Sequence, residues 1–345
     1  MMRAELYKIW KRKLVWEILL GMFLIMAVSE LYLNSYYFYG GHYEELQEEI
    51  KLHEKYRGVL TDERLQAFLE ERWGDFYRKY PDEEYNYMDA FFDADGNELT
   101  IQEISMNRVF PNQSFPIQFG FYQGWALFLD QLARYLKLIP VFAAVVFSSL
   151  FSYERECGME EILACTRNGR EDCIKAKIRA AFLVTNAVYF LLLCIPCGVA
   201  FFLYRGKGLG TSIQLTPWIR NSQLAMDYGT LLLHTFFLSI VIVNVTLLVA
   251  LTAAFRVKSP MKAACITLAV LFLLRPDLIS GYLGNAFLNQ ITSLTPINAM
   301  DTLNLAKQVP INIGNLKIHW LTIAEIMYSA AFVFGGVYFL REFHK

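Results

Sequence analysis

Long apolar stretches separated by charged segments form the main pattern of this chain. A membrane-spanning helix needs roughly 20 mostly apolar residues, and six stretches approach this length. They occupy residues 14–35, 132–152, 178–204, 229–255, 263–275 and 320–340. The fifth is short because Arg275 and Pro276 interrupt it, although Pro260 can start its helix earlier. The pattern predicts an all-α polytopic membrane protein with six transmembrane helices.

The composition supports this class. Hydrophobic residues make up 55% and aromatic residues 15% of the 345 positions, which is more than a soluble domain needs to form a core. The first apolar stretch has spanning length, and no small-residue cleavage site follows it. We therefore expect it to remain as a membrane anchor rather than to be removed as a signal peptide.

Basic residues indicate which loops face the cytoplasm. Lysine and arginine concentrate in the segments 1–13, 153–177, 256–262 and 341–345. Cytoplasmic loops carry an excess of these two residues, so all four segments are expected on that side. The chain is thus predicted to be a multi-pass protein of the cell membrane with both termini in the cytoplasm.

The segment 36–131 is the one loop long enough to form a domain. Helical periodicity predicts helices at 42–56 and 61–80, the second capped by Thr61. Asp95-Gly96 predicts a hairpin turn within 90–104. We expect a small, acidic, mixed α/β extracellular domain. It contains no cysteine, so no structural disulfide is expected there.

Two further loops are expected on the outer side. Residues 205–228 form a short connection. Residues 276–319 are moderately apolar but broken by glycine and proline. This pattern favours short helices that dip back into the outer leaflet, where backbone that does not span the membrane must be shielded by protein.

The sequence lacks signals for catalysis or metal binding by the chain itself. No phosphate-binding loop occurs, so the chain is not expected to hydrolyse ATP. Cys194 and Cys197 have the spacing of a metal or redox pair, but no third and fourth ligand lies near in the sequence, which favours packing around Pro196. Asp93 and Asp95 lack the distal glutamate of a calcium loop. We expect no catalytic residue, metal site or bound cofactor.

Four ionisable residues fall inside the apolar stretches, where a charge is costly. They are Glu17, Glu30, His234 and Glu325. Glu17, Glu30 and His234 are placed to anchor at the membrane interface. Glu325 lies deeper, where it either lines a transport pathway or forms a structural pair. Glu325 and Glu17 are the candidates for a pathway.

The N-terminal segment 1–13 alternates bases with apolar residues at helical spacing. Leu6, Ile9 and Trp10 form the apolar face. This pattern is typical of an interfacial helix on an anionic inner leaflet, and equally of the basic flank of a first span.

The charged segment between the second and third stretches carries a family resemblance. Its marks are Glu154 and Gly158 in E-x-x-x-G, the apolar turn from Glu161, Gly169-Arg170, and Ala176-Lys177. With six spans and the N-terminal helix, the chain resembles a permease subunit of the ABC type-2 exporters. It departs from the commonest family form at Arg167, where a proline usually stands.

The resemblance implies the type V ABC exporter arrangement. Residues 153–177 would include a coupling helix that docks on a soluble ABC ATPase, with Glu154, Gly158, Glu161, Arg170 and Lys177 as its members. ATP and Mg²⁺ would bind the ATPase. A second permease subunit, identical or different, would complete a dimer that exports a peptide, an antibiotic or a lipid-like substrate.

Two other classes of function remain open. The acidic, aromatic outer segment could capture extracellular cationic peptides in a membrane sensor or immunity protein. An intramembrane enzyme could use His234 and Glu325, although no nucleophile motif accompanies them. Lipid is an expected partner in every case, and nucleic acid is not.

Overall fold

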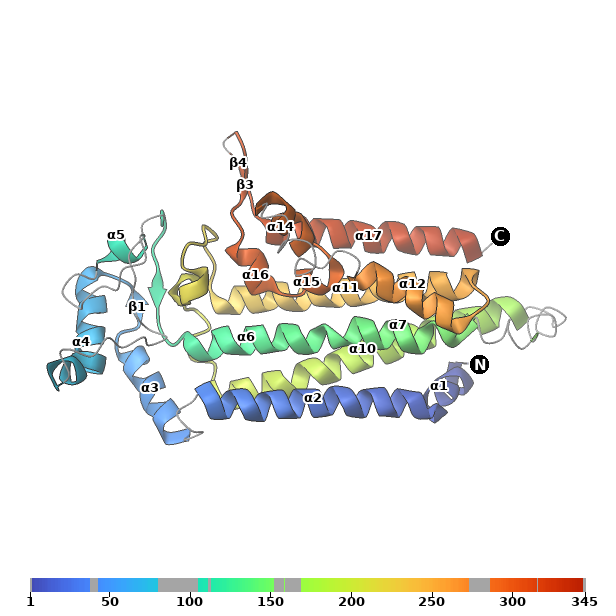
Figure 1. The fold of residues 1–345 in the computed structure, drawn as a ribbon, viewed down its shortest axis with the longest axis horizontal. Helices are drawn as coiled ribbons and strands as arrows, with labels where there is room; N and C mark the ends of the chain where they lie inside the picture. The colour runs from blue at the N-terminus through green and yellow to red at the C-terminus, as the bar shows by residue number, and fades with distance from the viewer. Residues whose placement is uncertain are drawn as a thin grey trace.

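The long helices of this computed structural model run side by side as an elongated bundle (Figure 1). The structure describes residues 2–37, 43–79, 105–110, 113–151, 158, 169–272, 286–314 and 316–343. The bundle helices are α2 (Lys13–Tyr37), α6 (Gln123–Leu136), α7 (Leu138–Phe147), α10 (Gly169–Tyr204), α11 (Tyr228–Arg256), α12 (Pro260–Phe272) and α17 (Trp320–Phe343). α6 and α7 follow one another along a single line. The protein is therefore mostly helical, as predicted.

Within the described residues, four helical stretches are long and apolar enough to cross a membrane. They are Gln123–Phe151, Glu171–Tyr204, Tyr228–Arg256 and Trp320–Arg341. These stretches coincide with the second, third, fourth and sixth predicted spans. α2 falls outside the four, and it carries Glu17 and Glu30. α12 is also outside because its described part is 13 residues long.

Two helix boundaries differ from the prediction. The second apolar helix starts at Gln123 rather than at 132, because Trp125, Phe128 and Leu129 bury an amphipathic face that the polar residues around Asp130 obscure in the sequence. α10 starts at Gly169, inside the predicted coupling segment, so residues 169–177 belong to the same helix as the third predicted span.

A small layer, the head, covers one end of the bundle (Figure 1). The head consists of α3 (Tyr43–Lys55), β1 (Gly58–Val59), α4 (Asp62–Lys79), α5 (Met106–Val109) and β2 (Gln118–Phe119). β1 and β2 pair antiparallel, with Gly58 opposite Phe119. α3 and α4 confirm the two predicted helices, and the Arg64 amide donates to Thr61 Oγ1 at 3.3 Å, as expected of a helix cap. The predicted hairpin at 90–104 lies outside the described residues.

The region before α17 contains short elements, as the broken apolar pattern suggested. They are α14 (Ala286–Ser293), α15 (Pro296–Ala299), α16 (Thr302–Lys307), β3 (Ile311–Ile313) and β4 (Leu316–Ile318). β3 and β4 form an antiparallel hairpin that projects away from the bundle (Figure 1). This hairpin was not predicted from the sequence, and its Ile313 and Leu316 are exposed.

Both termini lie at the end of the bundle opposite the head (Figure 1). The turn between α11 and α12 is at this basal end too. The described residues here include many bases: Arg3, Lys8, Lys11, Arg12, Lys13, Lys175, Lys177, Arg179, Arg256, Lys258, Lys262 and Arg341. The molecule therefore separates a basic end from the head.

Candidate functional site

The N-terminal helix α1 (Met2–Lys11) packs against the bundle at its basal end. Ile9 is fully buried in the main hydrophobic core, and Leu6 and Trp10 pack against that core. α10 is the main neighbour of α1 outside its own segment. The apolar face predicted to lie on lipid thus contacts the protein itself, because the start of α10 offers an apolar surface that includes Ile174 and Ile178.

The turn between α1 and α2 connects α1 to the helical stretch Gln123–Phe151. The Val15 amide donates to Arg12 O at 3.1 Å, which continues the chain into α2. Arg12 Nη1 donates to Ser149 Oγ at 2.6 Å. Trp16 Nε1 donates to Trp10 O at 2.7 Å, and the two indole rings lie 5.3 Å apart. A change in the position of α1 therefore reaches the residues around Ser149 directly.

Lys177 joins the two helices that flank the predicted coupling segment. Its side chain is only 2% exposed. Lys177 Nζ donates to Leu150 O at 3.3 Å and lies 5.5 Å from the centroid of the Phe151 ring. Lys177, predicted as a member of the coupling element, points into the chain's own interior.

These contacts define one cluster at the base of the bundle, the basal clamp. Its members are Ile9, Arg12, Ser149, Leu150, Phe151 and Lys177. The described residues on either side of the charged segment are Phe151 and those from Gly169 onward. Both ends of that segment are therefore tied to each other and to α1.

The other predicted members of the coupling element are only partly described. Glu154 and Glu161 lie outside the described residues, as does the side chain of Arg170, whose backbone belongs to α10. Gly158 is exposed with φ +68°, and a Cβ added at this position would meet no atom within 4 Å. This φ lies in the left-handed region, which favours glycine.

The two ionisable side chains near the head end of α11 and α17 contact each other. His234 Nδ1 lies 2.5 Å from Glu325 Oε1. The side chain of Glu325 is 16% exposed and that of His234 is 34% exposed. Of the two interpretations of Glu325, the structure shows the pairing. The two residues offered for an intramembrane enzyme thus form a contact between α11 and α17.

Glu17 lies in a different environment. Its carboxylate is 3.6 Å from Lys13 Nζ, one turn away on α2. The Glu17 side chain is 57% exposed, so it faces away from the bundle. An exposed ion pair of this kind contributes at most about 1 kcal/mol.

Neutral polar side chains link α10 to α11 within the bundle. Asn186 and Asn244 exchange amide hydrogen bonds at 3.1 and 3.2 Å. Tyr189 OH donates to Phe236 O at 2.9 Å. Polar pairs between apolar helices hold them in register, because an unpaired amide in hydrocarbon is costly. Sequence reasoning missed these residues, although asparagine inside an apolar stretch was an available signal.

The head contains a buried ionic network. Glu49 Oε1 lies 3.1 Å from His53 Nδ1 and 2.8 Å from Arg72 Nη2. The His53 ring stacks on Phe119 with centroids 5.6 Å apart. On the surface, hydrogen bonds from Lys55 and then from Tyr56 lower the pKa of Glu71. The contact between Glu49 and Arg72 ties α3 to α4.

Comparison of the chain with protein-family models, with curated proteins and with solved structures gives no match. Among the residues that the structure describes, no group of three or more His, Cys, Asp and Glu side chains could hold a metal ion.

Proposed function

We propose that this chain is the membrane-spanning permease subunit of an ATP-driven exporter, and that a separate soluble ATPase docks on its basal end. The observation that carries the proposal is the basal clamp. The segment that resembles an ABC type-2 coupling element has both of its ends joined through Lys177 and Leu150. Arg12 and Ile9 add α1 to the same unit.

This arrangement is suited to transmit motion. A displacement of the coupling segment acts on the second and third spans together, because Lys177 holds the start of α10 to the residues that follow α7. α1 moves with them, since it is packed on α10 and bonded to Ser149. ATP binding to the partner would then shift the population between inward-open and outward-open states.

The proposal also covers the number of spans, the outer domain, the orientation in the membrane and the partner subunits. α2 and α12 complete a set of six spans, and residues 36–131 form an extracellular domain that includes the head. The basic end faces the cytoplasm, in keeping with the excess of lysine and arginine there. The ATPase binds ATP and Mg²⁺, and a second permease subunit completes the exporter. The exported substrate is a peptide, an antibiotic or a lipid-like molecule.

Charge reversal in the coupling segment tests this function. Glu154→Lys combined with Arg170→Glu should release the ATPase from the membrane or uncouple ATP hydrolysis from export, because the docking charges are inverted. The matched control is Glu48→Lys with Lys51→Glu, which swaps two exposed charges on α3 at the other end. Normal coupling in the first double variant would refute the assignment.

A further inference from the structure

The β3–β4 hairpin has one apolar face and one polar face. Directly paired residues of two antiparallel strands lie on the same face, and alternate residues of a strand share a face. The register therefore places four aliphatic residues together: Ile311, Ile313, Leu316 and Ile318. Asn312 and Lys317 are paired on the other face. The hairpin is amphipathic, although each strand has three residues.

The apolar face is exposed towards the turn of the hairpin. Ile313 is 62% exposed and Leu316 is 61% exposed, whereas Ile311 and Ile318 at the base are half-buried. Exposed aliphatic side chains are unfavourable in water, and a hairpin of two short strands is marginally stable there by itself. A surface that removes Ile313 and Leu316 from water would stabilise the hairpin.

The base of the hairpin is fixed to the start of α17. Trp320 Nε1 donates to Val309 O at 2.9 Å, shortly before β3. Only His319 separates β4 from α17. α17 begins the stretch Trp320–Arg341, which is long and apolar enough to span a membrane. The hairpin therefore stands where this span leaves the hydrocarbon core.

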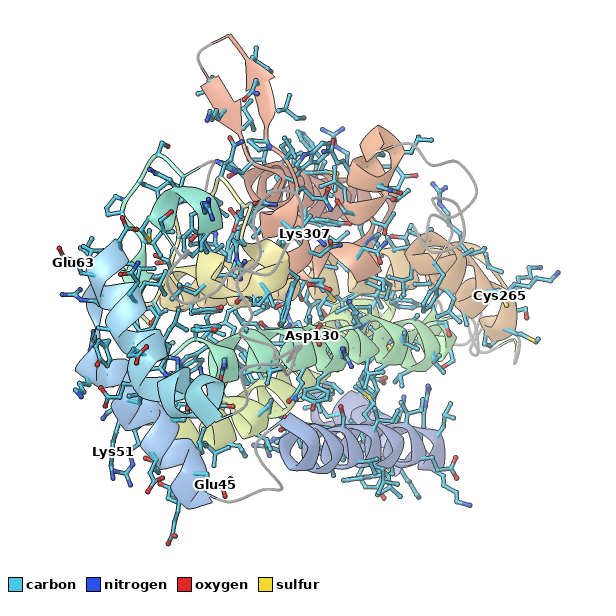
Figure 2. The ribbon with its side chains drawn as sticks, turned by 60° about the vertical axis from the view of Figure 1, so that its left-hand side comes forward. Glu45, Lys51, Glu63, Asp130, Cys265 and Lys307 are labelled. Atoms are coloured by element: carbon cyan, nitrogen blue, oxygen red, sulfur yellow. The ribbon has the colours of Figure 1, made fainter. Side chains whose placement is uncertain are left out.

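The hairpin runs across the direction of the long helices. In Figure 1 the bundle helices lie along the horizontal axis, and β3 and β4 point upward from the side on which α17 lies. In Figure 2, which is turned by 60° about the vertical axis, the hairpin again projects upward beyond Lys307. Spanning helices are tilted only moderately from the membrane normal. A segment that runs across them at one end therefore extends along the membrane surface.

The surface of α17 next to the hairpin is apolar as well. α17 exposes Ile326, Val333 and Phe334. A helix with apolar side chains around its circumference is typical of a membrane span. Because β4 leads directly into α17, the exposed face of the hairpin and the exposed surface of α17 adjoin. Lipid that covers α17 thus reaches the hairpin.

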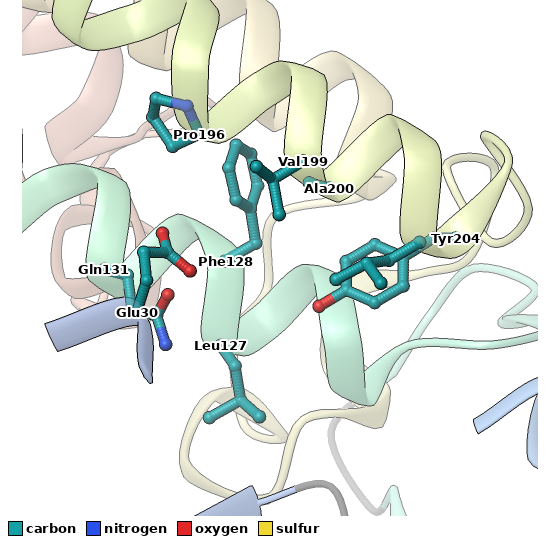
Figure 3. Close-up of a pocket in the computed structure, with 9 residues that line it drawn as sticks. Glu30, Leu127, Phe128, Gln131, Pro196, Val199, Ala200 and Tyr204 are labelled. Carbon is teal, nitrogen blue, oxygen red and sulfur yellow. The ribbon is translucent and has the colours of Figure 1, made fainter. Parts of the chain in front are cut away.

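Other apolar surface near the head end belongs to the bundle helices themselves. The cleft in Figure 3, for example, is lined by Leu127 and Phe128 from α6 and by Val199 from α10. Both helices are parts of candidate spans, so contact with acyl chains explains their apolar side chains. The hairpin lies outside the four candidate spans. Its apolar face needs an explanation of its own.

We propose that the β3–β4 hairpin lies in the lipid interface of the leaflet at the head end, where it anchors the start of α17. Ile313 and Leu316 face the acyl chains, and Lys317 on the opposite face stays among headgroups and water. Lys317 Nζ also donates to Gln223 Oε1 at 3.1 Å, which ties the polar face to the connection between α10 and α11. The proposal depends on the chain spanning a membrane, and not on the ATPase or on export.

Fluorescence quenching by nitroxide lipids tests the proposal. The full-length chain without native cysteines carries an NBD group on Leu316→Cys and is placed in nanodiscs of phosphatidylcholine. Part of the lipid bears a nitroxide, either at the headgroup or deep in the acyl chain. Glu63→Cys, exposed on the head, is the control in water (Figure 2). Val333→Cys, near the middle of α17, is the control in the hydrocarbon core.

The label at position 316 should be quenched more by the headgroup nitroxide than by the deep one, and its emission should be blue-shifted relative to the label at position 63. The label at position 333 should show the reverse order of quenching. A label at position 316 that behaves like the one at position 63 would overturn the proposal. A blue-shifted label that neither lipid quenches would also overturn it, because protein, such as a second copy of the chain, would then cover the hairpin.

Two substitutions separate the apolar face from mere nearness to the membrane. Ile313→Asn should shift the equilibrium between inserted and free hairpin about tenfold or more towards the free form, because burial of an aliphatic side chain is lost. Lipid quenching at position 316 should fall accordingly. Asn312→Ser, on the polar face, is the matched control and should leave quenching unchanged. Equal quenching in the two variants would contradict insertion through the apolar face.

Discussion

Ionisable side chains inside this bundle bind one another or backbone carbonyls. His234 meets Glu325 at 2.5 Å between α11 and α17, and Lys177 meets Leu150 O. His234 and Glu325 are 91 residues apart in the sequence, and Lys177 and Leu150 are 27 residues apart. A partner offsets the free-energy cost of placing a charged group in an apolar bundle. Removing that partner is therefore expected to lower the free energy of unfolding.

The pair of His234 and Glu325 gives a prediction for stability. Glu325→Gln should destabilise the protein by roughly 1–2 kcal/mol, less than for a fully buried pair because His234 is partly exposed. Glu17→Gln removes an exposed ion pair and should cost under about 1 kcal/mol. Thermal unfolding in detergent measures both. Adding His234→Gln to Glu325→Gln should cost less than the sum of the single changes, and full additivity would show that the pair is not coupled.

Gly208 gives a second prediction at this scale. It has φ +86°, and a Cβ there would lie 1.8 Å from Phe121 O. Gly208→Ala should therefore destabilise the turn after α10 by about 1–3 kcal/mol or more. Gly210→Ala, two residues on, meets nothing within 4 Å and serves as the control. Equal unfolding midpoints for the two variants would contradict the packing of this turn against the start of α6.

The elements differ in how far the sequence predicts them. α3 and α4 follow from helical periodicity and the Thr61 cap, both local signals. The early start of α6 was missed, because an amphipathic helix buried on one face by tertiary contacts has no long apolar run. The β3–β4 hairpin was missed since its strands are three residues each and largely exposed.

The candidate site depends on contacts that no local pattern contains. The sequence marked Lys177 as part of a coupling element within 153–177, and Ile9 as part of an interfacial helix. It did not predict that Lys177 would turn inward to Leu150, 27 residues earlier. Nor did it predict the contact between Arg12 and Ser149, which are 137 residues apart. Such contacts are set by how the helices pack, which depends on the whole chain.

α1 is predicted to be held on the bundle by its apolar face. Ile9→Ala should cost about 2–5 kcal/mol of local packing and free the N-terminal helix, because Ile9 is fully buried. Tyr7→Ala changes the exposed face of the same helix and is the control. Limited trypsin cleavage after Lys8, Lys11 and Lys13 measures the effect. Cleavage at the same rate in both variants would argue against docking of α1 on α10.

At the scale of the whole molecule, the two ends of the bundle differ in charge and in the segments that lie there. Both termini, the bases and the two ends of the charged segment lie opposite the head (Figure 1). The bundle between them is bridged by polar pairs such as Asn186 with Asn244. A change at the basal clamp can therefore reach the head end through continuous helices.

This polarity predicts the orientation in the membrane. In a variant without native cysteines, Val309→Cys near the head end should react with an impermeant thiol reagent added to intact cells. Lys258→Cys at the turn between α11 and α12 should react only after the membrane is opened, because the bases belong on the cytoplasmic side. The reverse labelling pattern would invert the proposed topology.

The most direct test of the proposed function is whether ATP hydrolysis accompanies the chain. The tagged full-length protein is isolated from its native membrane in mild detergent, and ATP hydrolysis of the isolated complex is measured. We predict an ATPase subunit bound to the wild-type chain, with activity that is lost from Glu154→Lys with Arg170→Glu although the variant reaches the membrane in normal amount. A wild-type chain isolated without any ATP-hydrolysing subunit would contradict the proposal.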